Sequence, residues 1–333
     1  MRETSSALAE TRVPASLHEA PLREMPLPYR KTFYPLGYSV EIETNESGVL
    51  AAAEGSFGHA QPSGRTTELK IRVGVTHQKG AVCPPEPTRR SFDELFSLKA
   101  DADNQALLDF KTGANFTWVT GAALKNQLYF RTNFLEKAVY LLLGASVVTD
   151  LHAACISRNC KGILLCGQSG AGKSTLAYAS ARQGWTYTSD DTSYLINSST
   201  RPRVIGHSHR ARFRPEARAL FPELAGRTIT PRMEGKPSIE VPIGELPVGR
   251  TAAEADIHAV VFLERRTASA CSLIRLPRGT ATNRMRRELF STGNIRARHE
   301  EKLEVFRSVS AYDLQYRDLK DGMEALESLT LQI

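Results

Sequence analysis

The stretch that most constrains this chain is residues 162–175, where an apolar run leads into a glycine-rich loop and then a helix-forming run. Gly167, Gly172, Lys173 and Ser174 fill the G-x-x-x-x-G-K-S pattern. Its glycines let backbone N–H groups turn towards an anion, and the following helix adds its positive N-terminus. We therefore predict a nucleoside triphosphate site. Its candidate residues are Gly167, Gln168, Ser169, Gly170, Ala171, Gly172, Lys173, Ser174 and Thr175.

The chain of 333 residues is long enough for about two domains. Period-two alternation at 38–44 and 69–75 predicts half-buried strands, and short runs at 95–102, 106–111, 116–120 and 128–131 predict a strand meander. The predicted organisation is a polar flexible tail (1–30), a β-rich accessory domain (31–133), a linker helix (134–150) and a phosphate-loop domain (151–333). The linker helix is expected to stop at Gly144.

The second domain is predicted to be mixed α/β. A strand at 152–156, a polar turn at 157–161, a helix at 174–182 and a strand at 185–189 surround the glycine loop. His299 and nearby arginines are assigned to the surface. Further strands are expected at 238–243, 257–263, 271–276 and 312–316, and further helices at 215–224, 283–291, 300–308 and 321–329.

Composition argues against several function classes. The net charge of +7 is modest, and no stacking aromatics alternate with the basic residues, so we predict no nucleic-acid partner. The apolar run at 138–148 is too short to span a bilayer, and the N-terminus lacks a signal pattern. The five cysteines lack the spacing of metal ligands, so we predict that they are buried thiols in a reducing compartment. A cytoplasmic protein without membrane insertion is the expectation.

Two adjacent carboxylates follow the glycine loop. Asp190 lies 17 residues after Lys173, which leaves room for one helix and one strand. In a doubly wound sheet, this spacing places Asp190 and Asp191 beside the loop, at the carboxyl ends of neighbouring strands. Phosphoryl transfer needs a carboxylate to hold Mg²⁺ and a group to orient or deprotonate the attacking hydroxyl. The two aspartates could divide these tasks, and a solvated Asp-Asp turn is the alternative.

The compound pattern resembles the kinase domain of the HPr serine kinase/phosphorylase family, whose phosphate-loop core is in turn similar to that of phosphoenolpyruvate carboxykinase. The pattern consists of His152 on the preceding strand, the loop from Gly167 to Ser174, an Arg-x-Gly helix stop, and Asp190 with Asp191. The resemblance covers residues 150–196 well and the rest of the second domain loosely.

The resemblance implies a mixed α/β kinase core that uses ATP and Mg²⁺. Asp190 would activate the acceptor hydroxyl with help from His152, and Asp191 would hold Mg²⁺ with Ser174. The loop pattern itself assigns Lys173 to contact with the terminal phosphates. Which aspartate takes which role stays open at this stage. The family also implies a homo-oligomer and a protein or peptide acceptor.

This chain differs from the family pattern at two places. Thr175 stands where the family usually has Glu, and no Glu-Ile-Arg-Gly run supplies a further acidic group. Glu240 is the candidate for that carboxylate and hence for the metal. The arginine-rich run 201–218 fits either a solvated face or a loop that contacts phosphate or the acceptor. The candidate contact residues are Arg210, Arg212, Arg214 and Lys236.

Three functions compete at this stage. The first is an ATP-dependent kinase that transfers the γ-phosphate to a serine-type hydroxyl of a protein or peptide. The second is another phosphate-loop nucleoside triphosphatase, although neither a Leu-Ser-Gly-Gly segment nor an Asn-Lys-x-Asp base reader is present. The third is a non-catalytic nucleotide-binding sensory module.

Overall fold

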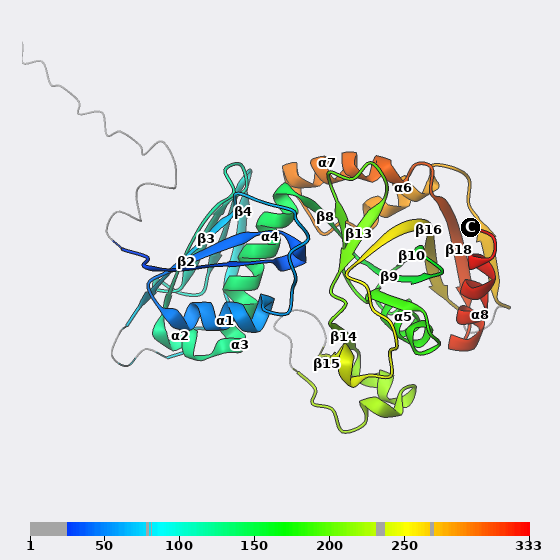
Figure 1. Cartoon of the computed structure of the whole chain (residues 1–333), viewed down its shortest axis with the longest axis horizontal. Helices are drawn as coiled ribbons and strands as arrows, with labels where there is room; N and C mark the ends of the chain where they lie inside the picture. Colours follow the sequence, from blue (N-terminus) through cyan, green and yellow to red (C-terminus); the bar gives the residue numbers. More distant parts are fainter. Residues whose placement is uncertain (1–24, 78–79, 81, 231–236, 267–269) are drawn as a thin grey trace, which may run out of the picture. The chain divides into compact units, whose positions relative to one another are not determined.

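The computed structural model describes residues 25–77, 80, 82–230, 237–266 and 270–333. The described chain forms two compact units (Figure 1). The first comprises the described residues up to 139 except 35–37 and 59–61, and the second comprises those two short segments and residues 140–333. The division falls within helix α4 (Glu136–Ser146). Most of the expected tail lies outside the described residues, and residues 29 and 30 already belong to a strand.

The first unit is built on a seven-stranded sheet in the order β1-β2-β3-β7-β6-β5-β4. The β2–β3 and β3–β7 pairs are parallel, and the other pairs are antiparallel. The strands are β1 (Tyr29–Phe33), β2 (Val40–Thr44), β3 (Lys70–Thr76), β4 (Thr88–Phe92), β5 (Leu95–Lys99), β6 (Gln105–Asp109) and β7 (Ala114–Thr120). The helices are η1 (Pro35–Gly37), α1 (Ser47–Phe57), α2 (Gly121–Lys125), α3 (Gln127–Phe130) and the π-helix η2 (Arg131–Leu135).

The helices of the first unit differ from the local structure predicted from the sequence. The expected runs at 95–102, 106–111 and 116–120 are present as β5, β6 and β7, but residues 127–130 form helix α3 and not a fourth extended run. The Asn126 side chain accepts a hydrogen bond from the Tyr129 backbone N–H and so caps α3. Helix α1 was not predicted from the sequence. It connects β2 to β3, which are parallel neighbours in the sheet, and a parallel pair requires such a crossover connection.

The second unit is built on a nine-stranded mixed sheet. Its strands run in the order β11-β9-β10-β16-β13-β12-β8, and β18 pairs with both β16 and β17. The strands are β8 (Val148–Leu151), β9 (Ala153–Arg158), β10 (Lys161–Cys166), β11 (Thr186–Ser189), β12 (Ser193–Ile196), β13 (Arg203–Gly206), β16 (Glu254–Arg265), β17 (Ser272–Arg275) and β18 (Ser310–Tyr316). A separate two-stranded ribbon consists of β14 (Arg210–Phe213) and β15 (Ile239–Pro242).

The helices of the second unit cover this sheet. They are α5 (Lys173–Arg182), α6 (Thr280–Met285), α7 (Gly293–Lys302) and α8 (Leu319–Thr330), with short 3-10 turns η3 (Pro215–Ala219), η4 (Pro222–Leu224), η5 (Ile243–Glu245), η6 (Arg286–Glu288) and η7 (Leu303–Phe306). The expected helices at 215–224, 283–291 and 300–308 are therefore broken into shorter pieces. None of the helices in the described part of the chain is long and apolar enough to cross a membrane.

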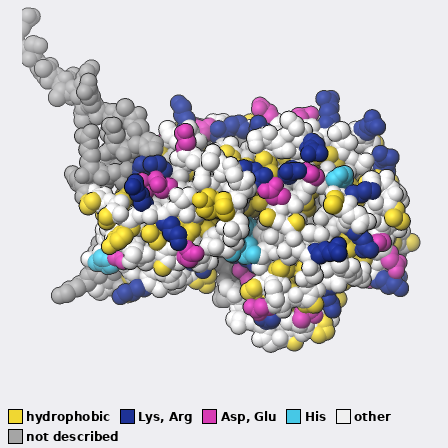
Figure 2. Space-filling view, viewed as in Figure 1, with side chains coloured by type: hydrophobic (Ala, Val, Ile, Leu, Met, Phe, Trp, Pro, Cys, Tyr) yellow, Lys and Arg dark blue, Asp and Glu magenta, His cyan; other side chains and the backbone are white. Residues whose placement is uncertain are grey.

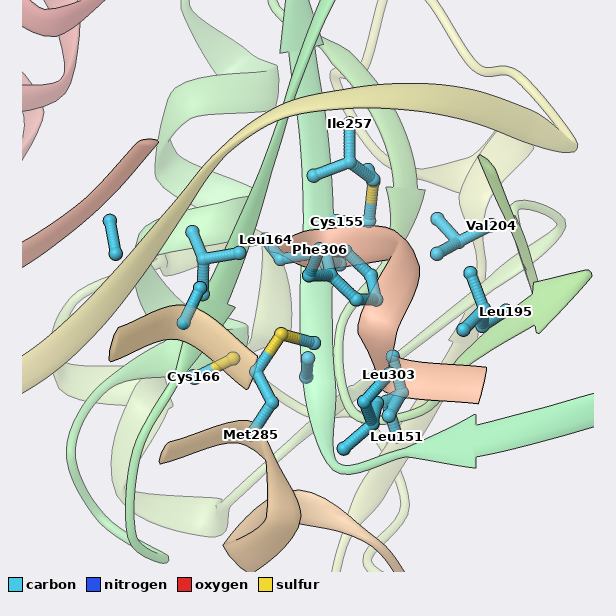
Figure 3. Packing of buried hydrophobic residues seen from close by; sticks show 14 of the residues in the cluster. Leu151, Cys155, Leu164, Cys166, Leu195, Val204, Ile257, Met285, Leu303 and Phe306 are labelled. Carbon is cyan, nitrogen blue, oxygen red and sulfur yellow. The ribbon is translucent and has the colours of Figure 1, made fainter. Parts of the chain in front are cut away.

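Strand β10 is buried on both faces, which explains its continuous apolar run. Ile163 and Leu165 pack with residues of α5 and α8 in one core cluster. Leu164 and Cys166 point to the opposite face, where they belong to a second core cluster together with Phe306 (Figure 3). Parallel strands covered on two sides lose the alternation of a half-exposed strand.

Three local expectations differ from the structure. Helix α4 continues past Gly144 to Ser146, because a single helical glycine costs only about 1 kcal/mol relative to alanine. His299, expected at the surface, is 3% exposed and hydrogen-bonds through Nε2 to the Gly144 carbonyl at 2.7 Å. Of the five cysteines, only Cys155 and Cys166 are buried, and the other three are exposed.

Candidate functional site

The glycine loop joins β10 to α5, so the strand, loop and helix occur in the predicted order. Gly167 (φ 142°) and Gly172 (φ 99°) adopt backbone angles that favour glycine. A Cβ on Gly172 would lie 2.0 Å from the Tyr316 hydroxyl oxygen. That hydroxyl donates to the Ala171 carbonyl at 2.6 Å. Tyr316 of β18 thus fixes the loop at a point where only glycine fits.

Lys173 is the first residue of helix α5, and its side chain lies over the glycine loop. Its side chain is buried, and its ammonium donates to the Gly167 carbonyl at 2.5 Å and approaches the Gln168 carbonyl at 3.5 Å. Burial lowers the pKa of Lys173, while the nearby Glu288 and Asp191 carboxylates oppose that shift. Because the Lys173 ammonium is held by carbonyl groups of the loop, it can exchange these carbonyls for the oxygens of a bound anion.

Asp190 and Asp191 follow β11, but β11 is not the neighbour of β10. Strand β9 lies between them and pairs antiparallel with both, which corrects the expectation of a doubly wound sheet with neighbouring strands. The cause is the tight β9–β10 hairpin, whose turn residues Asn159 and Cys160 have φ of 51° and 63°.

Even so, the candidate residues meet at one edge of the sheet. Because β10 and β11 are both antiparallel to β9, their carboxyl ends lie at the same edge as the start of β9, where His152 precedes Ala153. The Ser174 hydroxyl donates to the Asp190 backbone carbonyl at 3.0 Å and joins the helix start to the acidic pair.

The two aspartates have different surroundings. Asp190 is 7% exposed and accepts a hydrogen bond from the Arg212 backbone N–H at 2.7 Å. Burial, and then the Asp191 charge, raise the pKa of Asp190 to about 6. The Asp191 side chain is 40% exposed, and its Oδ1 lies 3.5 Å from His152 Nε2. The hydrogen-bonding interaction with His152 lowers the pKa of Asp191.

The arginines of the run 201–218 occupy different places. Arg212 pairs through Nε with Glu240 at 3.2 Å across the β14–β15 ribbon, so the structure brings Glu240 to an arginine. Arg214 donates to the Ser169 hydroxyl of the loop at 3.1 Å. The Arg210 carbonyl accepts a hydrogen bond from the Tyr187 hydroxyl at 3.1 Å. Lys236 lies outside the described residues.

The oxygen donors at this edge fit Mg²⁺. Ser174 and Asp191 offer a hydroxyl and a low-pKa carboxylate, and Mg²⁺ is usually held by one or two protein oxygens together with water and substrate phosphates. Within the described ranges, no group of three or more His, Cys, Asp or Glu residues could hold a metal by itself. Bound phosphates would therefore have to complete the coordination.

Glu288 is a site residue that the sequence analysis missed. It ends the short turn η6 and is 8% exposed, and its Oε2 lies 3.8 Å from His152 Nδ1. In the sequence it belongs to a charged run that is typical of a solvated helix, and no local pattern distinguishes it.

Across the described part of the molecule, acidic and basic side chains are interspersed on the face shown in Figure 2.

Comparisons with known proteins add little to this geometry. No protein-family model matches the chain, and no curated protein matches it. Among solved structures, the chain is similar to the HPr(Ser) kinase/phosphatase from Coxiella burnetii, at 11% identity and a TM-score of 0.29. The match covers 55% of this chain and 99% of that chain.

Proposed function

We propose that this protein is an ATP-dependent kinase that transfers the γ-phosphate to a serine-type hydroxyl of a peptide or protein. The observation that carries the proposal is the meeting of the glycine loop, Lys173 and two differently ionising aspartates at one sheet edge. A phosphate-binding loop, a cation and a carboxylate able to accept a proton are the groups that phosphoryl transfer to a hydroxyl requires.

The roles follow from the surroundings of each group. Asp190 accepts the acceptor's hydroxyl proton, since a carboxylate with a raised pKa is a better base near neutral pH. The acceptor oxygen forms a bond to the γ-phosphorus while the bond from that phosphorus to the β-bridging oxygen breaks, and ADP leaves. Asp191 stays charged, and it would hold Mg²⁺ together with Ser174. That ion, when bound, neutralises phosphate charge.

The acceptor side is assigned to the segment that contains Arg210, Arg212 and Arg214. Its backbone contacts Asp190 directly, and Arg214 reaches the glycine loop. Guanidinium groups bind carboxylates and phosphates in a planar, two-pronged manner, so an acidic peptide flanking the hydroxyl is the acceptor class that suits this segment.

A nucleotide-binding module without transfer activity is the second candidate. The feature that favours it is the burial of Asp190, whose carboxylate already accepts the Arg212 N–H. In that case Asp190 would serve to hold the β14–β15 ribbon, and a bound nucleotide would be the signal.

Phosphate transfer from radiolabelled ATP to a library of serine peptides separates the two candidates. We expect Asp190→Asn to lower transfer by roughly 10²-fold or more while ATP affinity stays within about twofold. Lys173→Ala should weaken ATP binding, with Lys320→Ala, an exposed lysine on α8, as the matched control. Full transfer by Asp190→Asn would refute the mechanism, and unchanged ATP affinity in Lys173→Ala would remove the loop from it.

A further inference from the structure

Glu288 is tied to His152 through the backbone. Leu289 forms an antiparallel bridge with Leu151, and the His152 backbone N–H donates to the Glu288 carbonyl at 2.7 Å. These contacts join the turn η6 to the start of β9, although the two segments are more than 130 residues apart. The position of the Glu288 side chain relative to His152 is therefore set by backbone structure.

The His152 ring lies between two carboxylates. Its Nδ1 is 3.8 Å from Glu288 Oε2, and its Nε2 is 3.5 Å from Asp191 Oδ1. The Phe290 ring, two residues after Glu288, packs against the imidazole at 5.3 Å between ring centroids. An imidazole can interact through both nitrogens at once, so a charge at each end and an aromatic ring beside it restrict its orientation.

The surroundings of Glu288 affect its ionisation in two directions. Burial raises the pKa of Glu288, whereas Lys173, His152 and the backbone amide of Gly167 stabilise its charged form. Glu288 in turn favours the charged form of Lys173. The Glu288 carboxyl group is therefore subject to opposing influences: burial favours its neutral form, and the neighbouring charges and the amide favour its charged form.

Resting on the kinase function proposed above, we propose that Glu288 is a positioning residue of this site. It holds the His152 imidazole in the orientation that faces Asp191, and through that contact it supports turnover.

The variant Glu288→Gln keeps the size of the side chain and removes its charge. We expect kcat for transfer to fall about tenfold or more, as is common for residues that orient a catalytic group. We expect the ATP dissociation constant to stay within about twofold of the wild-type value, because Glu288 acts on His152 and not on the nucleotide. A general folding defect would weaken both, so the split distinguishes positioning from a structural role.

The test measures kcat and the ATP dissociation constant of Glu288→Gln, with Glu301→Gln on the exposed face of α7 as the matched control. Control-like values for both quantities, or a joint loss of both, would overturn the proposal. An NMR cross-peak between the His152 and Phe290 rings should be present in the wild type and absent in Glu288→Ala. Its persistence would also overturn the proposal.

The proposed function and the role of Glu288 fail in different ways. Wild-type protein that binds no ATP would refute the kinase assignment. Wild-type turnover together with an unaffected Glu288→Gln would refute only the assignment of Glu288. The ring contact is measured without nucleotide and tests the placement of His152 in either case.

Discussion

Asp190 should make the folded protein less stable at neutral pH, so its removal should stabilise the chain. The side chain is 7% exposed, and burial is the main reason that its pKa rises from 3.8 to about 6. One pKa unit corresponds to about 1.36 kcal/mol, so ionising Asp190 in the folded protein costs about 3 kcal/mol more than in the unfolded chain. Asp190→Asn removes that cost and keeps an oxygen that can accept the Arg212 N–H.

The sign depends on pH. Below about pH 4, Asp190 is protonated in both states, and its favourable contribution to folding is fully present. As the pH rises through about 6, the unfolded chain has already released its proton, and the contribution is lost. The stability gain of Asp190→Asn should therefore be close to zero near pH 4 and reach up to about 3 kcal/mol above pH 7.

Urea unfolding without nucleotide or Mg²⁺ measures this gain. In a Trp118→Phe background, Trp185 is the remaining tryptophan and reports on the second unit. The control is Asp103→Asn, an exposed aspartate of the first unit, which should change nothing. If Asp190→Asn is no more stable than the wild type at pH 7.5, the carboxylate is not held in the desolvated environment described, and its role as a base loses its basis.

Two further predictions concern the loop and the thiols. Gly172→Ala should destabilise the protein by about 1–3 kcal/mol and weaken ATP binding, because a Cβ at a φ of 99° would meet the Tyr316 hydroxyl. A Tyr316→Phe background should recover part of both losses in unfolding and binding assays, and no recovery would argue against that contact. With a thiol reagent, three cysteines should react in the native protein, whereas Cys155 and Cys166 should react only on unfolding, since both are buried. Equal rates for all five thiols would contradict the packing of β9 and β10.

The sequence determined the parts of this protein that depend on near neighbours in the chain. The loop from Gly167 to Ser174 follows from residue types at fixed spacing, and the structure has the strand, loop and helix in that order. The strands β2, β3 and β16 to β18 were predictable for the same reason, because alternation or a continuous apolar run reflects which side chains a strand buries.

Only the tertiary structure decided which distant residues meet. Strand β11 pairs with β9 and not with β10, and the packing of α7 buries His299 against Gly144. Glu288 stands in a charged run whose local pattern indicates a solvated helix, yet it lies beside His152. Burial of a polar group is decided by what packs over it. The hydrophobic periodicity of the sequence predicts the helix or strand that carries a polar side chain. It does not predict which element packs over that side chain.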